Sequence, residues 1–194
     1  YEIHERLVGS EMCIRDRTVT LDALNAKFDL LNEKCIVNHS CYFGATNDNY
    51  TEFDKLDKHR VCGIKLFMGS STGNMLVDKM NSLLKIFNGT DMLIAAHCED
   101  QETIKANIEK YRQKYKGADD IPVNAHPGIR SVPACYASSE LAVRLARIAG
   151  ARLHILHVST AKELQLFSDE PLEDKNITSE ACVAHLLFTL AHYN

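Results

Sequence analysis

The sequence predicts an α/β fold built around a parallel sheet, and two observations support this prediction. Short apolar runs typical of strands alternate with segments of helical periodicity from residue 20 to residue 183. Strands and helices that alternate in this way form parallel sheets with right-handed crossovers. In addition, three of the apolar runs end in nitrogen-bearing side chains, at Lys65, His97 and His157. Because the carboxyl ends of parallel strands meet at one edge, we expect these groups to share one face.

The first half of the chain contains three of the five predicted strands. Leu21, Leu24, Phe28 and Leu31 have helical spacing and follow Thr20, a suitable N-cap, so the pattern predicts a helix over 20–34. Strands are then expected over residues 35–43, 61–68 and 92–97, and helices over 52–60, 75–87 and 100–116. Glycines at positions 89 and 117 follow the last two helices, as is common at helix ends.

The second half begins with a long loop over 118–133, which contains three of the four prolines. A helix is expected over 134–149, ended by Gly150, and then a strand over 152–158, a helix over 161–167 and a strand over 177–183. A doubly wound sheet would be complete with five strands. Against a nucleotide-binding domain of that kind, no Gly-x-Gly-x-x-Gly follows a strand and no P-loop lysine is present.

Composition excludes several other classes of protein. The chain has 194 residues, 45% of them hydrophobic and 25% charged, with a net charge of −4, so neither a basic nucleic-acid surface nor disorder is indicated. Its apolar runs are too short for a membrane span. Seven scattered cysteines without a Cys-x-x-Cys pair argue against a zinc ribbon or a disulfide framework, and they favour a reducing, cytoplasmic location.

Strand alternation supports convergence of the three nitrogen-bearing residues. Each alone fits a structural role, as a snorkelling lysine or a hydrogen-bonded histidine, so the prediction depends on their coincidence. Side chains alternate along a strand, so His157 is expected on the face of Ile155, and His154 on the opposite face. Lys65, His97 and His157 can then all face the interior of one barrel or one side of one sheet, where metal-dependent hydrolases place their chemistry.

Five segments of the chain resemble the dihydroorotases of the amidohydrolase superfamily. They are residues 63–74 (Gly-Ile-Lys-Leu-Phe-Met-Gly-Ser-Ser-Thr-Gly-Asn), 95–100, 126–131, 153–164 and 177–188. The resemblance covers residues 18–194 and implies a partial (β/α)₈ TIM barrel of the metal-dependent hydrolase type, with about five of its eight strands present. Residues 1–17 are expected to be a non-native leader, because residues 8–16 look like translated sequencing adapter.

The resemblance also implies a function and a site. The family opens the cyclic amide of dihydroorotate reversibly to N-carbamoyl-L-aspartate in pyrimidine biosynthesis, using two Zn²⁺ ions per intact site. It implies that Lys65, as its carbamate, and the imidazoles of His97 and His157 bind metal. Arg130 is a candidate for substrate binding, although a role in packing its loop is the stronger expectation. Small-molecule substrates and a homo-oligomer of the intact protein are further implications.

Departures from the family pattern limit these implications. No His-x-His pair occurs in the sequence, and the family's proton-shuttling aspartate would lie beyond residue 194, so no catalytic residue is assigned. The chain also has Ala184 before His185 where relatives often have two histidines, and His185 is expected to be structural. We therefore expect an internal fragment that is inactive alone, cannot close its barrel and leaves inward residues such as Ile36 and Val183 without partners.

Alternatives within and outside the family remain open at this point. A hydantoinase, dihydropyrimidinase or allantoinase would share the lysine and both histidines, although the Ser-Ser-Thr-Gly-Asn turn favours dihydroorotase. A non-catalytic assembly partner of a pyrimidine-pathway enzyme would also show the resemblance. Glu99 and Asp100 fit either partners that orient His97 or a charged pair at a helix N-terminus, and the second interpretation is favoured.

Overall fold

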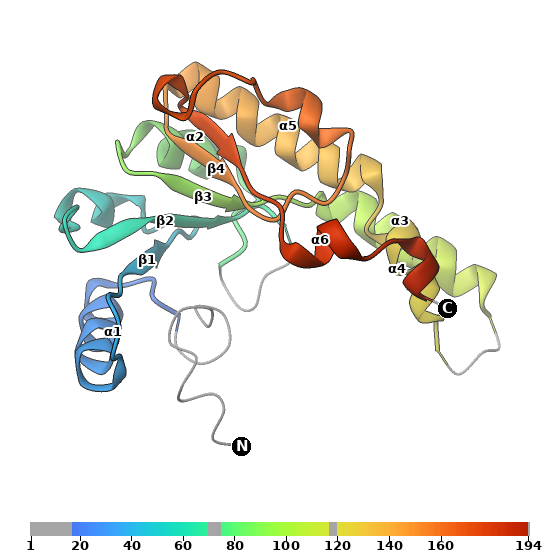
Figure 1. The fold of residues 1–194 in the computed structure, drawn as a ribbon, viewed down its shortest axis with the longest axis horizontal. Helices are drawn as coiled ribbons and strands as arrows, with labels where there is room; N and C mark the ends of the chain where they lie inside the picture. The colour runs from blue at the N-terminus through green and yellow to red at the C-terminus, as the bar shows by residue number, and fades with distance from the viewer. Residues whose placement is uncertain (1–16, 70–74, 117–119, 194) are drawn as a thin grey trace.

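The computed structural model describes residues 17–69, 75–116 and 120–193 (Figure 1). Its centre is a parallel five-stranded sheet in the order β1-β2-β3-β4-β5, which confirms the predicted α/β class. The strands are β1 (Cys41–Gly44), β2 (Val61–Phe67), β3 (Ile94–His97), β4 (Leu153–Ile155) and β5 (Ile177–Ser179). Within the described ranges, β1 and β5 each pair on one side only, so they form the two edges of this sheet.

Helices connect β2 to β3 and β3 to β4, whereas the helices predicted over 52–60 and 161–167 are instead short 3₁₀ turns, Tyr50–Lys55 and Glu163–Leu166. The helices are α1 (Leu21–Lys34), α2 (Met80–Asn88), α3 (Gln101–Lys114), α4 (His126–Ile129), α5 (Val132–Ala149) and α6 (Val183–Leu187), with short 3₁₀ turns between them. Thr20 caps α1 as predicted, because its Oγ1 accepts the backbone N–H of Ala23 at 3.2 Å. Gly150 ends α5 in the left-handed region at φ 66°, where a side chain would be strained.

Several predicted boundaries are wrong. The strand expected over 35–43 is only β1, and Ile36 in the preceding loop is fully exposed. The strand expected over 177–183 ends at Ser179, and Val183 instead begins α6, where it is 70% exposed. Neither residue therefore lies on an inward sheet face. The helix expected from residue 75 starts at Met80, because Val77 N–H first donates to the carbonyl of Phe67.

One face of the sheet forms the core with the helices. Ile64, Ile94 and Leu153 align across β2, β3 and β4, and all are fully buried. They pack in one cluster with the apolar sides of α2 and α5, represented by Ile86 and Val143. In Figure 1, α2 and α5 lie together on the same side of the strands. Burial of such side chains contributes about 1.5–3 kcal/mol each, which is why this face fixes the register.

The opposite face of the sheet carries polar side chains, and they are not all the ones that strand alternation predicted. The register aligns Lys65 with Ala95 and Ala95 with His154, so these residues share one face. Ile155 lies on the other face, with the core. The prediction that His157 is brought inward by sharing a face with Ile155, and that His154 points away, is therefore wrong. His157 lies beyond the end of β4, so a turn with positive φ, not strand alternation, sets its direction.

Some sequence predictions fall outside the described residues. Residues 1–16 and the Ser-Ser-Thr-Gly-Asn turn at 70–74 lie there, so the predicted leader over 1–17 and the specificity of that turn stay predictions. Among the helices that the structure does describe, none combines the length and the apolar character needed to cross a bilayer.

Candidate active site

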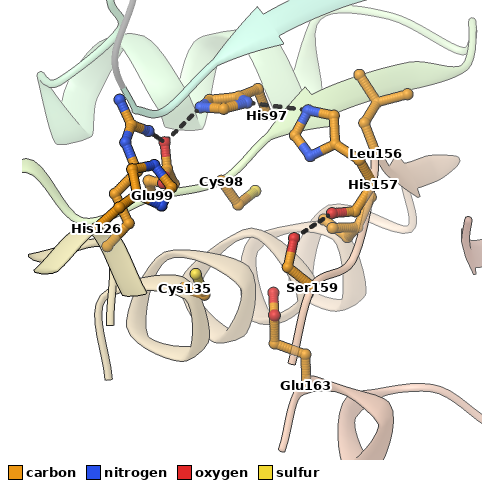
Figure 2. A pocket seen from close by; sticks show the side chains of 11 residues that line it. His97, Cys98, Glu99, His126, Cys135, Leu156, His157, Ser159 and Glu163 are labelled. Atoms are coloured by element: carbon orange, nitrogen blue, oxygen red, sulfur yellow. Dashed lines mark hydrogen bonds and ion pairs between the residues drawn. The ribbon is translucent and has the colours of Figure 1, made fainter. Parts of the chain in front are cut away.

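A pocket of about 300 Å³ opens at the carboxyl ends of β3 and β4 (Figure 2). Its walls come from the segments that follow these two strands and from α4, α5 and the 3₁₀ turn Glu163–Leu166. The lining residues are His97, Cys98, Glu99, His126, Arg130, Cys135, Ile155, Leu156, His157, Ser159 and Glu163. A pocket at this end of a parallel sheet is where enzymes of this architecture place their active sites.

Two of the three predicted metal ligands, His97 and His157, meet in this pocket. Nδ1 of His97 lies 3.1 Å from Nε2 of His157, and the ring centroids are 4.9 Å apart. Both rings are partly buried, and burial together with the charge of His97 lowers the pKa of His157. A neutral imidazole at neutral pH is the form that binds metal ions or exchanges protons.

A strained turn brings His157 to the pocket. The strand β4 ends at Ile155, and His157 has φ 40°, the only positive φ of a non-glycine residue in the described ranges. This turn redirects the side chain away from the core face that alternation would give it. Its backbone N–H donates to Oε1 of Glu180 at 3.3 Å, and its carbonyl accepts Oγ–H of Ser159 at 2.9 Å. Side chains on both sides thus hold a backbone conformation that costs roughly 1–3 kcal/mol.

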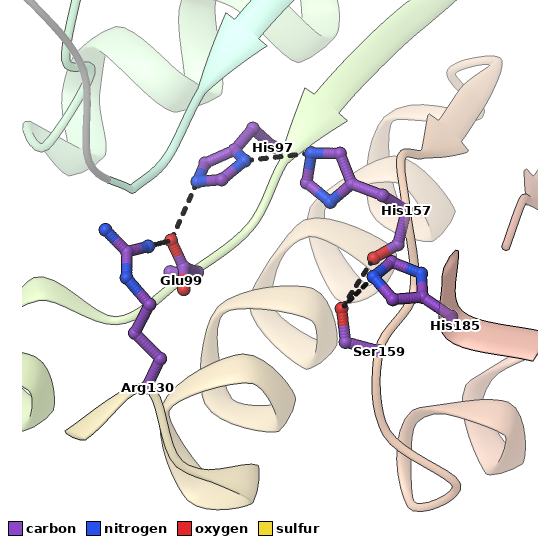
Figure 3. Close-up of polar contacts among 6 residues, drawn as sticks. All are labelled: His97, Glu99, Arg130, His157, Ser159 and His185. Carbon is purple, nitrogen blue, oxygen red and sulfur yellow. Dashed lines mark hydrogen bonds and ion pairs between the residues drawn. The ribbon is translucent and has the colours of Figure 1, made fainter. Parts of the chain in front are cut away.

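His185 completes the contacts around this turn (Figure 3). Its Nδ1 accepts the backbone N–H of Cys182 at 3.3 Å, which leaves the proton of the neutral ring on Nε2. That nitrogen lies 3.4 Å from Oγ of Ser159, so Nε2–H donates to the serine while the serine donates to His157. The structural role expected for His185 is therefore a role in supporting the His157 turn.

His154 has a separate environment. Its Nδ1 lies 2.8 Å from Oγ1 of Thr178, and its Nε2 lies 3.3 Å from Oε2 of Glu180. It is not among the residues that line the pocket. Although His154 shares the sheet face of Lys65, its partners come from β5 and the residue after it, so it is a structural histidine. Its partner Glu180 also accepts the backbone N–H of His157.

Glu99 is a pocket residue that contacts His97, which was the less favoured of its two sequence interpretations. Its side chain is 10% exposed, and Oε2 lies 2.9 Å from Nε2 of His97 while also forming an ion pair with Nη1 of Arg130. Burial of the carboxyl favours its neutral form, but the hydrogen bonds from His97 and Arg130 outweigh burial and lower its pKa to about 2. Asp100 alone acts as the helix N-terminal group, because Oδ2 accepts the N–H of Thr103 at 2.8 Å. The interpretation favoured for Glu99 is therefore wrong.

Lys65 approaches the pair of histidines from the neighbouring strand. It lies on β2, two register positions before the pair Phe67–His97, and its Nζ is 4.1 Å from the centroid of the Phe67 ring. After burial and the charge of His97, the positive charge of Lys65 also lowers the pKa of His157. The structure thus brings Lys65, His97 and His157 to one end of three adjacent strands, although Lys65 does not line the pocket.

Glu163 is a second buried carboxylate in the pocket. It is 3% exposed, and its two oxygens accept hydroxyl groups, Ser139 Oγ–H at 2.6 Å and Thr160 Oγ1–H at 2.7 Å. These contacts tie the 3₁₀ turn to α5. No spacing signal in the sequence distinguished this residue from a surface glutamate of an amphipathic helix.

The two pocket cysteines, Cys98 and Cys135, are expected to be unreactive. Burial raises the pKa of Cys98 to about 12 and that of Cys135 to about 11. Both therefore stay protonated thiols at neutral pH, and a thiol is a poor nucleophile and a poor metal ligand. The polar groups left for chemistry in this pocket include His97, His157 and the Glu99–Arg130 pair.

The histidine pair fits one metal ion in part. Two imidazole nitrogens bound at ~2.0–2.1 Å to one tetrahedral Zn²⁺ are separated by roughly 3.3 Å. The 3.1 Å between Nδ1 of His97 and Nε2 of His157 is close to that value. However, the described residues contain no group of three or more His, Cys, Asp or Glu arranged to hold a metal. They therefore offer two imidazole nitrogens at this spacing, with Lys65 on the strand adjacent to that of His97.

Comparison with solved structures finds hydantoinases with a similar fold. The chain superposes on the L-hydantoinase (dihydropyrimidinase) of Arthrobacter aurescens with a TM-score of 0.74 and 25% identity, covering 84% of this chain and 36% of that one. A D-hydantoinase gives a TM-score of 0.70 at 18% identity over 93% of this chain and 39% of the other. The fold is thus that of a partial amidohydrolase barrel, as predicted.

Comparison of sequences finds dihydroorotases among the relatives of the chain. The dihydroorotase of Shouchella clausii is 27% identical over 180 residues, 90% of this chain and 39% of the enzyme. That of Listeria innocua is 24% identical over 177 residues, again 90% of this chain and 39% of the enzyme. No family model matches the chain. The predicted resemblance is confirmed: the relatives are cyclic amidohydrolases, and the chain spans about two-fifths of the length of these two.

Proposed function

We propose that this chain carries part of the active site of a zinc-dependent dihydroorotase. The observation that supports the proposal best is the approach of His97 and His157 to 3.1 Å in a pocket at the carboxyl end of the sheet. The dihydroorotase relatives in sequence and hydantoinase relatives in structure support cyclic amides as the substrate class. The finer assignment to dihydroorotate in pyrimidine biosynthesis rests on the sequence relatives.

The proposed metal ligands have distinct roles. Nδ1 of His97 and Nε2 of His157 would hold one Zn²⁺, since these atoms face each other. Lys65 would serve as its carbamate, which converts a partly buried ammonium into an anion that can bind a cation. A bound Zn²⁺ supplies a Lewis acid that polarises an amide carbonyl and lowers the pKa of water. The chain's own residues then position that ion and shield the pocket.

Arg130 is the residue proposed to contact substrate. It lines the pocket and its side chain is 35% exposed, so a substrate carboxylate could reach it. Its ion pair with Glu99 supports the alternative role in organising the loop. Substrate binding by Arg130 therefore remains the weaker proposal of the two.

The decisive experiment measures Zn²⁺ binding to the purified 194-residue chain by calorimetry in bicarbonate buffer. We expect His97→Ala and His157→Ala each to weaken binding by at least tenfold, because each removes one of two imidazole ligands. His59→Ala is the control, since it removes an exposed histidine that does not line the pocket. Equal binding by all four proteins, or no binding by the wild type, would refute the metal site.

Hydrolysis assays with dihydroorotate and hydantoin test the substrate class. We expect any turnover to favour dihydroorotate and to be slow beside the Shouchella clausii enzyme, of which the chain spans 39%. A preference for hydantoin would move the assignment to the hydantoinases. Zinc binding without turnover of either substrate would favour a non-catalytic relative.

A further inference from the structure

The two ring nitrogens of His97 have different partners, and this difference carries information about its proton. Nε2 faces Oε2 of Glu99 at 2.9 Å, whereas Nδ1 faces Nε2 of His157 at 3.1 Å (Figure 3). A carboxylate accepts hydrogen bonds and cannot donate one. In the neutral ring, the proton of His97 must therefore be on Nε2, and the lone pair must be on Nδ1, directed at His157.

Arg130 keeps the carboxylate in this position. Glu99 is 8% exposed, and the same oxygen that faces His97 forms the ion pair with Arg130. A buried carboxylate without a cationic partner would become protonated or turn to solvent, because burial penalises its charge. With Arg130 in place, the carboxylate remains an acceptor at a fixed distance from His97.

We infer that Glu99, held by Arg130, is a positioning residue that selects the Nε2–H tautomer of His97 and thereby presents Nδ1 as a ligand in the pocket. This inference deepens the proposed function and rests on it for the metal, but the tautomer itself is a property of the metal-free chain. Carboxylates that receive the second ring proton of a metal-binding histidine typically raise metal affinity by about 10–100-fold.

The other buried carboxylate of the pocket supplies a matched control. Glu163 lines the same cavity and is also buried, yet its oxygens accept the hydroxyls of Ser139 and Thr160, and no contact to His97 is found in the described structure. A general effect of negative charge or packing in the pocket would therefore appear in both Glu99 and Glu163 variants. Selection of a tautomer would appear only at Glu99.

The first measurement is nitrogen NMR of the histidine rings in the metal-free, ¹⁵N-labelled 194-residue chain above the histidine pKa range, with His97 assigned by His97→Ala. We expect Nε2 of His97 to be protonated in the wild type and in Glu163→Gln. Glu99→Leu removes the acceptor and should give a mixed or reversed tautomer. If it disrupts folding, as circular dichroism would show, Glu99→Gln offers a milder change, because its amide oxygen is a weaker acceptor.

The second measurement is Zn²⁺ affinity of the same proteins. Glu99→Gln should weaken binding about tenfold or more, while Glu163→Gln should stay within about twofold of the wild type. A wild-type His97 protonated on Nδ1, or an unchanged tautomer in a folded Glu99→Leu, would overturn the inference. So would equal losses of affinity in the Glu99 and Glu163 variants.

The two readouts separate this inference from the proposed function. A wild-type chain that binds no Zn²⁺ but shows the Glu99-dependent tautomer would refute the zinc site and retain tautomer selection. A chain that binds Zn²⁺ with no dependence on Glu99 would retain the zinc site and refute the positioning role.

Discussion

The two pocket histidines are held in different ways. His97 ends a regular strand, and a buried carboxylate contacts its ring directly. His157 follows the end of its strand, and its backbone rather than its ring is held, by Glu180 and Ser159. One ring is thus positioned through a charged side-chain contact, and the other through a strained turn.

The residues that hold His97 are also more buried than those that hold His157. The side chain of Glu99 is 10% exposed, whereas that of Glu180 is 46% exposed, and Ser159 is exposed as well. A hydrogen bond to a buried charge contributes more than one exposed to water, since water competes for the same groups. We therefore expect changes around His97 to cost more stability than changes around His157, and the following predictions test that difference.

The largest effect is expected for Arg130→Leu. This change leaves the Glu99 carboxylate buried without its cation, and breaking a fully buried pair typically costs 3–5 kcal/mol. Because the side chain of Arg130 is 35% exposed, we expect a smaller loss of roughly 1–3 kcal/mol in the free energy of unfolding, measured in urea.

The matched control for Arg130→Leu is Arg144→Leu, which removes an exposed arginine from the middle of α5. It should change the free energy of unfolding by less than ~0.5 kcal/mol. Equal losses for the two variants would mean that the Glu99 ion pair adds nothing beyond ordinary surface effects.

The next effect concerns which replacement, glycine or alanine, gives the more stable protein. We expect the answer to be opposite at His97 and His157. Within a strand, alanine is normally more stabilising than glycine by roughly 0.5–1 kcal/mol. The free energy of unfolding of His97→Ala should therefore be higher than that of His97→Gly by a similar amount. At His157 the backbone has φ 40°, which glycine adopts without strain. We expect His157→Gly to be more stable than His157→Ala by about 1 kcal/mol.

Thermal or urea unfolding of these four variants measures the reversal. Each Gly/Ala pair lacks the imidazole, so the comparison isolates the backbone from the lost ring contacts. The same order at both positions would show that the turn at His157 is not strained in solution.

How far the sequence predicted this site can be judged from the same histidines. The order of strands and helices, and the placement of Lys65, His97 and His157 at strand ends, were readable from apolar periodicity and from the dihydroorotase-like segments. The alternation rule failed at His157 because β4 is only three residues long and the chain turns before reaching it. A period of two applies only while the strand continues.

The contact between Glu99 and His97 was accessible in the sequence but was given the wrong weight. The His-x-Glu spacing places both side chains on the same side of an extended segment, which favours contact, whereas helix-start statistics favoured a capping role. Asp100 satisfied the cap alone, which freed Glu99 for the pocket. The partner Arg130 lies 31 residues away in the chain, and no local pattern predicts a pairing at that distance.

The smallest effect is expected for Ser159→Ala. Ser159 donates to the carbonyl of His157 and receives the ring N–H of His185, but it is exposed, so water can replace it. We expect a loss of about 0.5 kcal/mol in the free energy of unfolding, similar to Ser168→Ala, which removes another exposed serine with a local acceptor.

The two variants should differ instead in the pocket, because only Ser159 supports the turn that directs His157. Zinc affinity should therefore fall several-fold in Ser159→Ala and stay unchanged in Ser168→Ala, whereas Ser159→Thr, which keeps the hydroxyl, should retain most of the affinity. Equal affinity in the two alanine variants would mean that Glu180 and the chain itself suffice to hold the turn, and a stability loss above ~2 kcal/mol for Ser159→Ala would mean that His157 is anchored as firmly as His97.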